Sequence, residues 1–138
     1  MNKEKLLDTA FKAMRNAYAP YSKYNVGAAV ETKDGQFIMG ANIENASYPA
    51  GICGERTAIF ATYALGYRQK DIEAICIVTS GDRIGTPCGV CRQVLSELLL
   101  PKTPILLSNG KEEMLTNIKE LLPYSFSSED LSKWNQDL

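Results

Sequence analysis

The chain of 138 residues contains no histidine. Histidine is the usual side chain for acid–base chemistry near neutral pH and the commonest metal ligand, so other residues must perform both roles here. The chain also lacks an excess of charges of one sign, because it has 15 lysines and arginines and 16 aspartates and glutamates. This balance argues against nucleic acid as a partner held by bulk electrostatics.

Long apolar runs are absent as well. No segment approaches the roughly 18 uninterrupted apolar residues of a membrane span, and charges occur throughout the N-terminal stretch. We therefore expect no membrane partner and a cytoplasmic location. Because the cytosol keeps thiols reduced, the four cysteines should be free, metal-bound or catalytic rather than disulfide-paired. The length suits one domain over residues 1–138, without repeats or a linker.

Hydrophobic periodicity and turn residues predict alternating helices and strands. Helices are expected over residues 3–19, 54–65 and 86–100, with a helical turn at 118–122. Strands are expected over residues 26–32, 36–41, 72–79, 104–108 and 114–115, and the tail from Pro123 should be irregular. This order predicts an α/β fold, in which a mixed sheet has helices packed on its faces.

Three cysteines stand where a loop enters a predicted helix. Cys88 and Cys91 follow Pro87 three residues apart, and Cys53 ends a glycine-rich loop. A C-x-x-C pair alone also occurs in redox sites and structural zinc fingers. Three sulfurs at helix starts, however, can converge on one metal. The fourth cysteine, Cys76, lies within an apolar strand and is expected to be a core residue. Since closed structural zinc sites use four protein ligands, the pattern predicts a zinc ion with one position open to water.

Two arginines and one glutamate accompany these cysteines. Three thiolates weaken zinc as a Lewis acid unless positive charge lies nearby. The helical spacing of Arg56 and Arg92 predicts that each guanidinium lies against a thiolate, and the alternative is a pair of ordinary surface arginines. Glu55 is expected to carry protons between the metal-bound water and a substrate; its alternative is a favourable charge at a helix start.

The motifs Cys53-Gly54-Glu55 and Pro87-Cys88-Gly89-Val90-Cys91 resemble the C/H-x-E and P-C-x-x-C signature of zinc-dependent deaminases. Similarity to the small, all-cysteine cytidine deaminases extends over nearly the whole chain, through the segments APYSKYNVGAAV (19–30), NIENASY (42–48), ERTAIF (55–60), CRQVLSEL (91–98) and LLPYSFSSEDL (121–131). The resemblance implies zinc-dependent hydrolysis of cytidine and deoxycytidine to uridine and deoxyuridine in pyrimidine salvage, with release of ammonia. Glu55 would protonate N3 of the base and later deliver a proton to the departing amine.

The same resemblance implies a homotetramer of single-domain, three-layer α-β-α subunits, each with a five-stranded mixed sheet and one zinc ion. Asn42 and Glu44 would hold the ribose hydroxyls of the nucleoside, although both residues could instead cap a loop. Ala46 and Tyr48 match positions that family members present across subunit contacts. Phe126 matches an aromatic residue offered to a neighbour's active site, so active sites would be shared between subunits.

Two further substrate-binding positions depart from the family pattern. Tyr24 stands where phenylalanine usually stacks near the base, and its hydroxyl group needs a partner or water. Gly54 replaces a common alanine between the metal ligand and the glutamate, which keeps backbone groups available to the base but loosens the turn.

The residues also allow other functions. Blasticidin-S deaminase shares both cysteine motifs, but the NIEN and LLPYSFSSEDL segments argue against it. Deaminases that act on tRNA or single-stranded DNA generally use a histidine ligand and basic strand contacts, which a near-neutral chain without histidine fits poorly. A zinc-stabilised interaction module would need a fourth protein ligand and would tolerate Glu55→Gln.

Overall fold

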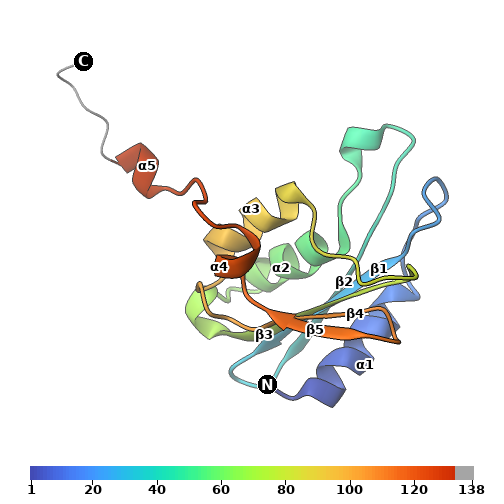
Figure 1. The fold of residues 1–138 in the computed structure, drawn as a ribbon, viewed down its shortest axis with the longest axis horizontal. Coiled ribbons are helices and arrows are strands. Elements are labelled where there is room, and N and C mark those ends of the chain that lie inside the picture. The colour runs from blue at the N-terminus through green and yellow to red at the C-terminus, as the bar shows by residue number, and fades with distance from the viewer. Residues whose placement is uncertain (133–138) are drawn as a thin grey trace.

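The structure is a computed structural model that describes residues 1–132. Five strands form one mixed sheet in the order β2-β1-β3-β4-β5, and every neighbouring pair is antiparallel except β3 and β4. The strands are β1 (Val26–Thr32), β2 (Phe37–Ala41), β3 (Ile72–Thr79), β4 (Ile105–Ser108) and β5 (Glu113–Thr116). The predicted three-layer α/β architecture is confirmed (Figure 1). The single domain predicted for residues 1–138 stays a prediction, since residues 133–138 lie outside the described part.

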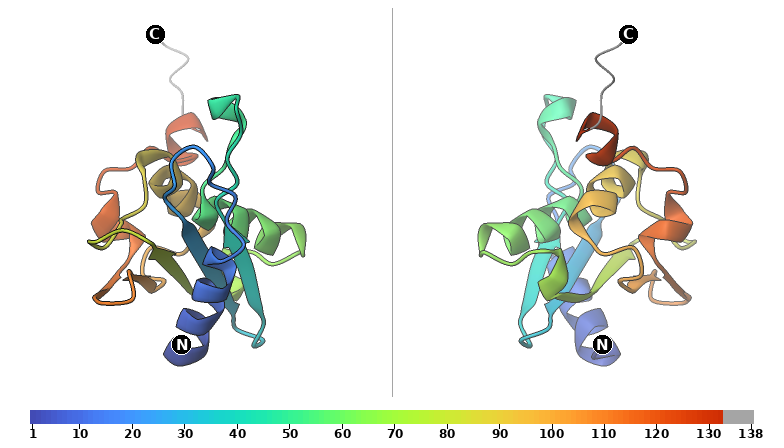
Figure 2. Two further views of the ribbon diagram at one scale, coloured as in Figure 1. Left: turned by 90° about the vertical axis from the view of Figure 1, so that its right-hand side faces the viewer. Right: turned by 90° about the vertical axis from the view of Figure 1, so that its left-hand side faces the viewer.

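Helices cover both faces of the sheet (Figure 2). They are α1 (Lys3–Met14), α2 (Gly54–Ala64), α3 (Gly89–Leu98), α4 (Ile118–Leu121) and α5 (Glu129–Ser132), with 3-10 turns η1 (Tyr48–Ala50) and η2 (Gln69–Asp71). α1 packs on one face, and α2 and α3 pack on the other. The parallel β3–β4 pair requires a crossover connection, which α3 provides. Within residues 1–132, no helix is long and apolar enough to cross a membrane.

β3 is buried on both of its faces. Ile75 and Ile77 belong to the hydrophobic cluster that contains Ile59 of α2 and Leu95 of α3. Cys76 belongs to the opposite cluster, which lies against α1, and its side chain is fully buried. Because successive strand side chains point to opposite faces, a strand covered on both sides needs a continuous apolar sequence. Cys76 is therefore the core residue that the sequence predicted.

α1 is shorter than predicted. The apolar periodicity continues to residue 19, but the helix ends at Met14. Tyr18 leaves the helical path to form an isolated bridge with Ile43, and its backbone N–H donates to the carbonyl of Asn42 at 2.9 Å. Pairing between distant segments thus overrides the local helical pattern.

α3 begins later than predicted, at Gly89 instead of residue 86. Cys88 has an extended backbone (φ −65°, ψ 169°) and is the N-cap of the helix, so Pro87 lies before the helix and not in its first turn. The C-terminal segment also differs from the prediction, because the irregular stretch after Pro123 ends in α5, which extends away from the sheet (Figure 1).

β1 and α1 approach each other closely at Gly27. A Cβ atom at this position would lie 2.2 Å from the carbonyl oxygen of Ala10 and 2.4 Å from the backbone nitrogen of Met14. We expect Gly27→Ala to lower the free energy of unfolding by about 1–3 kcal/mol, the usual cost of overpacking, in urea titrations. Gly89→Ala is the matched control, because nothing lies within 4 Å of its Cβ position. An unchanged urea midpoint for Gly27→Ala would contradict this packing.

Candidate metal centre

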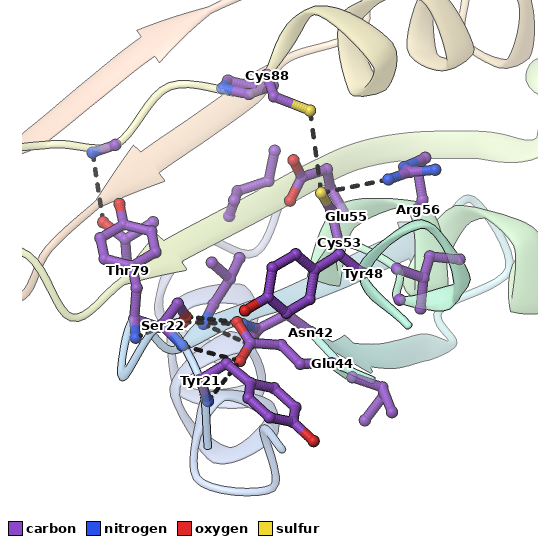
Figure 3. A pocket seen from close by; sticks show the side chains of 18 of the residues that line it. Tyr21, Ser22, Asn42, Glu44, Tyr48, Cys53, Glu55, Arg56, Thr79 and Cys88 are labelled. Carbon is purple, nitrogen blue, oxygen red and sulfur yellow. Dashed lines mark hydrogen bonds between the residues drawn. The ribbon is translucent and has the colours of Figure 1, made fainter. Parts of the chain in front are cut away.

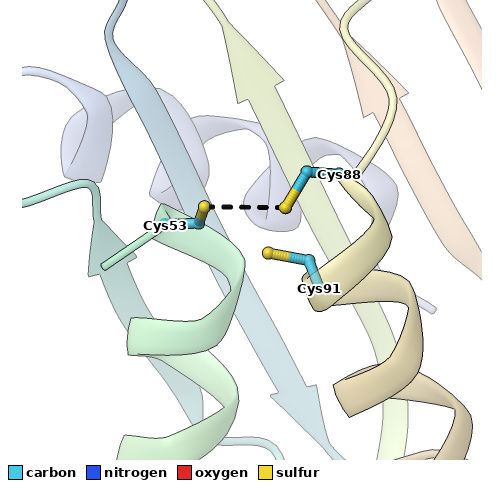
Figure 4. A group of neighbouring side chains, drawn as sticks. All are labelled: Cys53, Cys88 and Cys91. Atoms are coloured by element: carbon cyan, nitrogen blue, oxygen red, sulfur yellow. Dashed lines mark hydrogen bonds between the residues drawn. The ribbon is translucent and has the colours of Figure 1, made fainter. Parts of the chain in front are cut away.

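Two helices begin side by side on one face of the sheet. Cys53 is the N-cap of α2 and Cys88 is the N-cap of α3, and neither side chain makes a capping hydrogen bond. Cys91 lies in the first turn of α3 and is fully buried. The three Sγ atoms lie within 4.8 Å of one another, with 3.9 Å between those of Cys53 and Cys88 (Figure 4). No other metal-ligating side chain joins this cluster among residues 1–132.

The three sulfurs fit zinc. Zinc–sulfur bonds of about 2.3 Å in tetrahedral geometry place neighbouring sulfurs roughly 3.8 Å apart, and the Cys53 and Cys88 sulfurs are 3.9 Å apart. The starts of α2 and α3 direct their positive dipole ends at the cluster. Each helix start typically stabilises a nearby negative charge by about 0.3–1 kcal/mol. Three protein ligands leave one tetrahedral position for a ligand that the protein does not supply.

Arg56 and Glu55 adjoin the sulfurs. Nη2 of Arg56 donates to Sγ of Cys53 at 3.4 Å, as the helical spacing predicted. A hydrogen bond with Cys91, aided by the Arg56 guanidinium, lowers the pKa of Cys53 to about 5. The same hydrogen bond, burial and the neighbouring Glu55 raise the pKa of Cys91. Glu55 is only 4% exposed, and burial raises the pKa of its carboxyl group.

Arg92 does not lie where we predicted. We expected its guanidinium against a thiolate, but it donates to oxygen atoms instead. Nε donates to the carbonyl of Pro87 at 2.7 Å, Nη1 to the carbonyl of Leu121 at 2.8 Å, and Nη2 to Oγ1 of Thr86 at 2.9 Å. All three acceptors are oxygen atoms of neighbouring segments, and the contact with a sulfur is made by Arg56 instead.

A cavity of about 610 Å³ opens beside the cysteines. Small-molecule sites commonly have volumes of about 300–1,000 Å³. Figure 3 shows Cys53 and Glu55 at one end of this cavity and Glu44, Ser22 and Tyr21 at the other. Four predicted substrate-binding residues line it: Tyr24, Asn42, Glu44 and Tyr48.

The other three predicted substrate-binding residues do not line the cavity. Ala46 is exposed on the loop before η1. Gly54 is buried behind the wall, where a Cβ atom would lie 2.9 Å from Cγ1 of Val26. Phe126 is 57% exposed, and its carbonyl accepts a hydrogen bond from Nε2 of Gln93 at 2.9 Å.

Asn42 and Glu44 hold the loop that precedes β1. The Glu44 carboxylate accepts a hydrogen bond from the Ser22 hydroxyl and two more from backbone N–H groups at 3.0 Å, and these bonds lower its pKa. Asn42 is 7% exposed; its Oδ1 accepts from the N–H of Val26 and its Nδ2 donates to the carbonyl of Tyr24, both at 2.8 Å. Both residues therefore cap a loop, as the alternative interpretation proposed, and they also line the cavity.

Tyr24 lies against the segment that follows β3. A Cβ atom at Gly85 would lie 2.2 Å from the Tyr24 hydroxyl oxygen, and one at Gly81 would lie 3.1 Å from the ring. Oγ1 of Thr79, another wall residue, accepts from the N–H of Gly85 at 3.3 Å. These three residues were not predicted from the sequence. The two glycines were the available signal, since glycine often marks a close approach of the backbone.

Comparisons with known proteins agree on one family. The model of the "cytidine and deoxycytidylate deaminase zinc-binding region" matches residues 1–107. A cytidine deaminase from Halalkalibacterium halodurans is 46% identical over 134 residues, which cover 96% of this chain and 99% of that protein. One from Sporosarcina psychrophila is 42% identical over 133 residues, 96% of each chain. The crystal structure of cytidine deaminase from Burkholderia pseudomallei matches with a TM-score of 0.87 at 42% identity, covering 91% of this chain and 100% of that one.

The low pKa of Cys53 predicts unusual thiol reactivity in the metal-free protein. With a pKa of about 5, Cys53 is a thiolate throughout the range from about pH 6.5 to 8, so its alkylation by iodoacetamide should hardly change with pH. Arg56→Ala should restore some pH dependence. Cys76 should stay unreactive in the folded chain, because it is fully buried and burial raises its pKa to about 12. Peptide mass spectrometry measures each site, and a Cys53 rate that rises about tenfold per pH unit would contradict the assignment.

Proposed function

This chain belongs to the cytidine deaminase family, and we propose that it converts cytidine and deoxycytidine to uridine and deoxyuridine with release of ammonia. The observation that carries the proposal is a three-sulfur cluster beside a buried glutamate at one end of a nucleoside-sized cavity. In the net reaction, the oxygen of water is added at C4 of the base and the exocyclic nitrogen leaves as ammonia.

Zinc is the cofactor, and Cys53, Cys88 and Cys91 would hold it. When bound, zinc supplies a Lewis acid that lowers the pKa of water from about 15.7 to about 7. Arg56 supports this chemistry, because its hydrogen bond to Cys53 takes electron density from one of the three thiolates. The two helix starts offset further negative charge on the sulfurs.

Glu55 would move the protons. Its position beside Cys53 places the carboxyl group at the cavity, and burial raises its pKa (Figure 3). A raised pKa favours a carboxyl group that donates as well as accepts protons. In the proposed sequence Glu55 takes a proton from the attacking water and gives it to N3 of the base, and it afterwards takes the second proton of that oxygen and gives it to the departing amine. With no histidine in the chain, it is the acid–base group of the cavity best suited to this role.

The far end of the cavity suits the sugar. The Glu44 carboxylate holds its loop through three hydrogen bonds and, as an ionised group with four lone-pair sites, still has acceptor capacity for a hydroxyl group. Asn42 stands next to it in the wall, and the Tyr24 ring offers an apolar face to the base. These three residues would contact a nucleoside in the proposed complex.

A homotetramer with shared active sites completes the proposal. Ala46 and Tyr48 lie on a projecting loop, and Phe126 lies on the C-terminal segment; all three are exposed, Tyr48 at 77% (Figure 1). These exposed side chains are available for contact with other subunits in the proposed assembly. The proposed location is the cytoplasm, where reducing conditions keep thiols available to bind a metal.

Glu55→Gln tests the proton-transfer role. Glutamine keeps the shape of the side chain but cannot carry a proton, so we expect one bound zinc per chain and a kcat for cytidine about 10²- to 10⁴-fold lower than wild type. Metal analysis and an absorbance assay measure the two properties. Glu97→Gln, at an exposed glutamate of α3, is the control and should behave as wild type. Normal turnover by Glu55→Gln would refute the mechanism and favour a structural zinc module.

Zinc removal tests the cofactor and the substrate together. A chelator should abolish cytidine conversion, and added zinc should restore it. Blasticidin S should be a much poorer substrate than cytidine, since Asn42 and Glu44, the candidates for binding the ribose hydroxyl groups, line the cavity. Full activity in the metal-free protein, or faster turnover of the antibiotic, would overturn the proposal.

A further inference from the structure

Cys88 is the metal-ligand candidate that receives least support from regular structure. Cys53 directly follows Ile52, which forms a β-bridge with Ile43, and Cys91 lies inside α3. Cys88 instead lies outside the helix, is exposed, and ends the segment 80–88, which contains neither helix nor strand. Its sulfur can keep a fixed position only if other contacts hold this backbone.

Arg92 makes those contacts. Its backbone N–H donates to the carbonyl of Cys88 at 2.9 Å. Its side chain donates from Nε to the carbonyl of Pro87 at 2.7 Å and from Nη2 to Oγ1 of Thr86 at 2.9 Å. One residue therefore binds three consecutive residues that lead into the metal site.

The guanidinium is itself anchored from outside this segment. Nη1 donates to the carbonyl of Leu121, the last residue of α4, at 2.8 Å. Arginine suits this role, because its planar group carries donors in fixed directions and hydrogen bonds from charged donors are stronger than neutral ones. Pro87 is buried and has no backbone N–H, so its carbonyl is the only backbone group by which it can be held.

We propose that Arg92 is a positioning residue that sets the place of the Cys88 sulfur by clamping residues 86–88 against α4. It acts through the backbone, since its guanidinium donates to oxygen atoms and not to a sulfur. The inference rests on the proposed zinc site. The two hypotheses can fail separately. If the zinc site is wrong, the wild-type protein will not bind metal through its thiolates; if only the role of Arg92 is wrong, the wild-type protein will still do so.

Arg92→Ala in the metal-loaded protein tests the inference. We expect zinc to pass to a chromophoric chelator about tenfold faster or more, the usual cost of losing an outer contact of a metal ligand. In the cobalt-substituted protein we expect shifted d–d absorption bands, because these bands report the arrangement of the sulfurs around the metal and not the stability of the fold.

Arg68→Ala is the matched control. Nη1 of Arg68 also donates to two backbone carbonyls, those of Tyr63 at 3.1 Å and Tyr67 at 2.7 Å, but near the end of α2 that lies away from the cysteines. This variant loses comparable hydrogen bonds, so we expect a lower urea midpoint with wild-type zinc release and a wild-type cobalt spectrum.

Arg92→Lys keeps the inference testable if Arg92→Ala does not fold. Lysine retains the charge but lacks the planar group, so it cannot reach three divergent acceptors together. We expect this variant to release zinc faster than wild type but more slowly than a protein that lacks all the side-chain hydrogen bonds of Arg92. Wild-type release and an unshifted cobalt spectrum in the folded Arg92 variant would overturn the inference. Equal changes in the Arg68 and Arg92 variants would also overturn it, because they would show an effect of general destabilisation.

Discussion

The meeting of two helix starts over one face of the sheet is the constraint on which the rest of this structure depends. Gly40 of β2 makes part of it possible, because a Cβ atom there would lie 2.3 Å from the backbone nitrogen of Ala58 and 2.6 Å from the carbonyl of Gly54. Since α2 can therefore pack directly on β2, its first residue is held where α3 also begins. The meeting of the two helix starts brings together three sulfurs, two helix dipoles and one buried carboxyl group.

Charge at this site is balanced by several small contributions. Three thiolates bound to one metal would place negative charge in a partly buried site, where the two helix starts and the Arg56 guanidinium offset it. Burial raises the pKa of Glu55 beside these sulfurs, because it disfavours the charged form of the carboxyl group. Each charged residue therefore has a distinct role. Arg56 donates to a sulfur, Arg92 donates to the backbone that carries another sulfur, and Glu55 moves protons in the proposed mechanism.

The architecture and the metal cluster could be predicted from the sequence because both depend on local patterns. The limits of β1 and β3 agree with the apolar runs, and the three cysteines converge as their positions at loop–helix junctions indicated. Long-range pairing could not be predicted in this way. Tyr18 leaves its helix to pair with Ile43, and Arg92 turns from the sulfurs to carbonyls. Helical spacing limits which atoms a long side chain can reach, but the acceptors it meets are set by the tertiary structure.

Cys53, Cys88 and Cys91 would together hold one zinc ion, whose remaining position would belong to solvent or substrate. Zinc K-edge X-ray absorption of the purified protein tests this claim most directly. We predict three sulfur neighbours at about 2.3 Å and one lighter atom that changes when a nucleoside analogue is added. Four sulfur neighbours, or a coordination sphere that a Cys88→Ser substitution leaves unaltered, would contradict it.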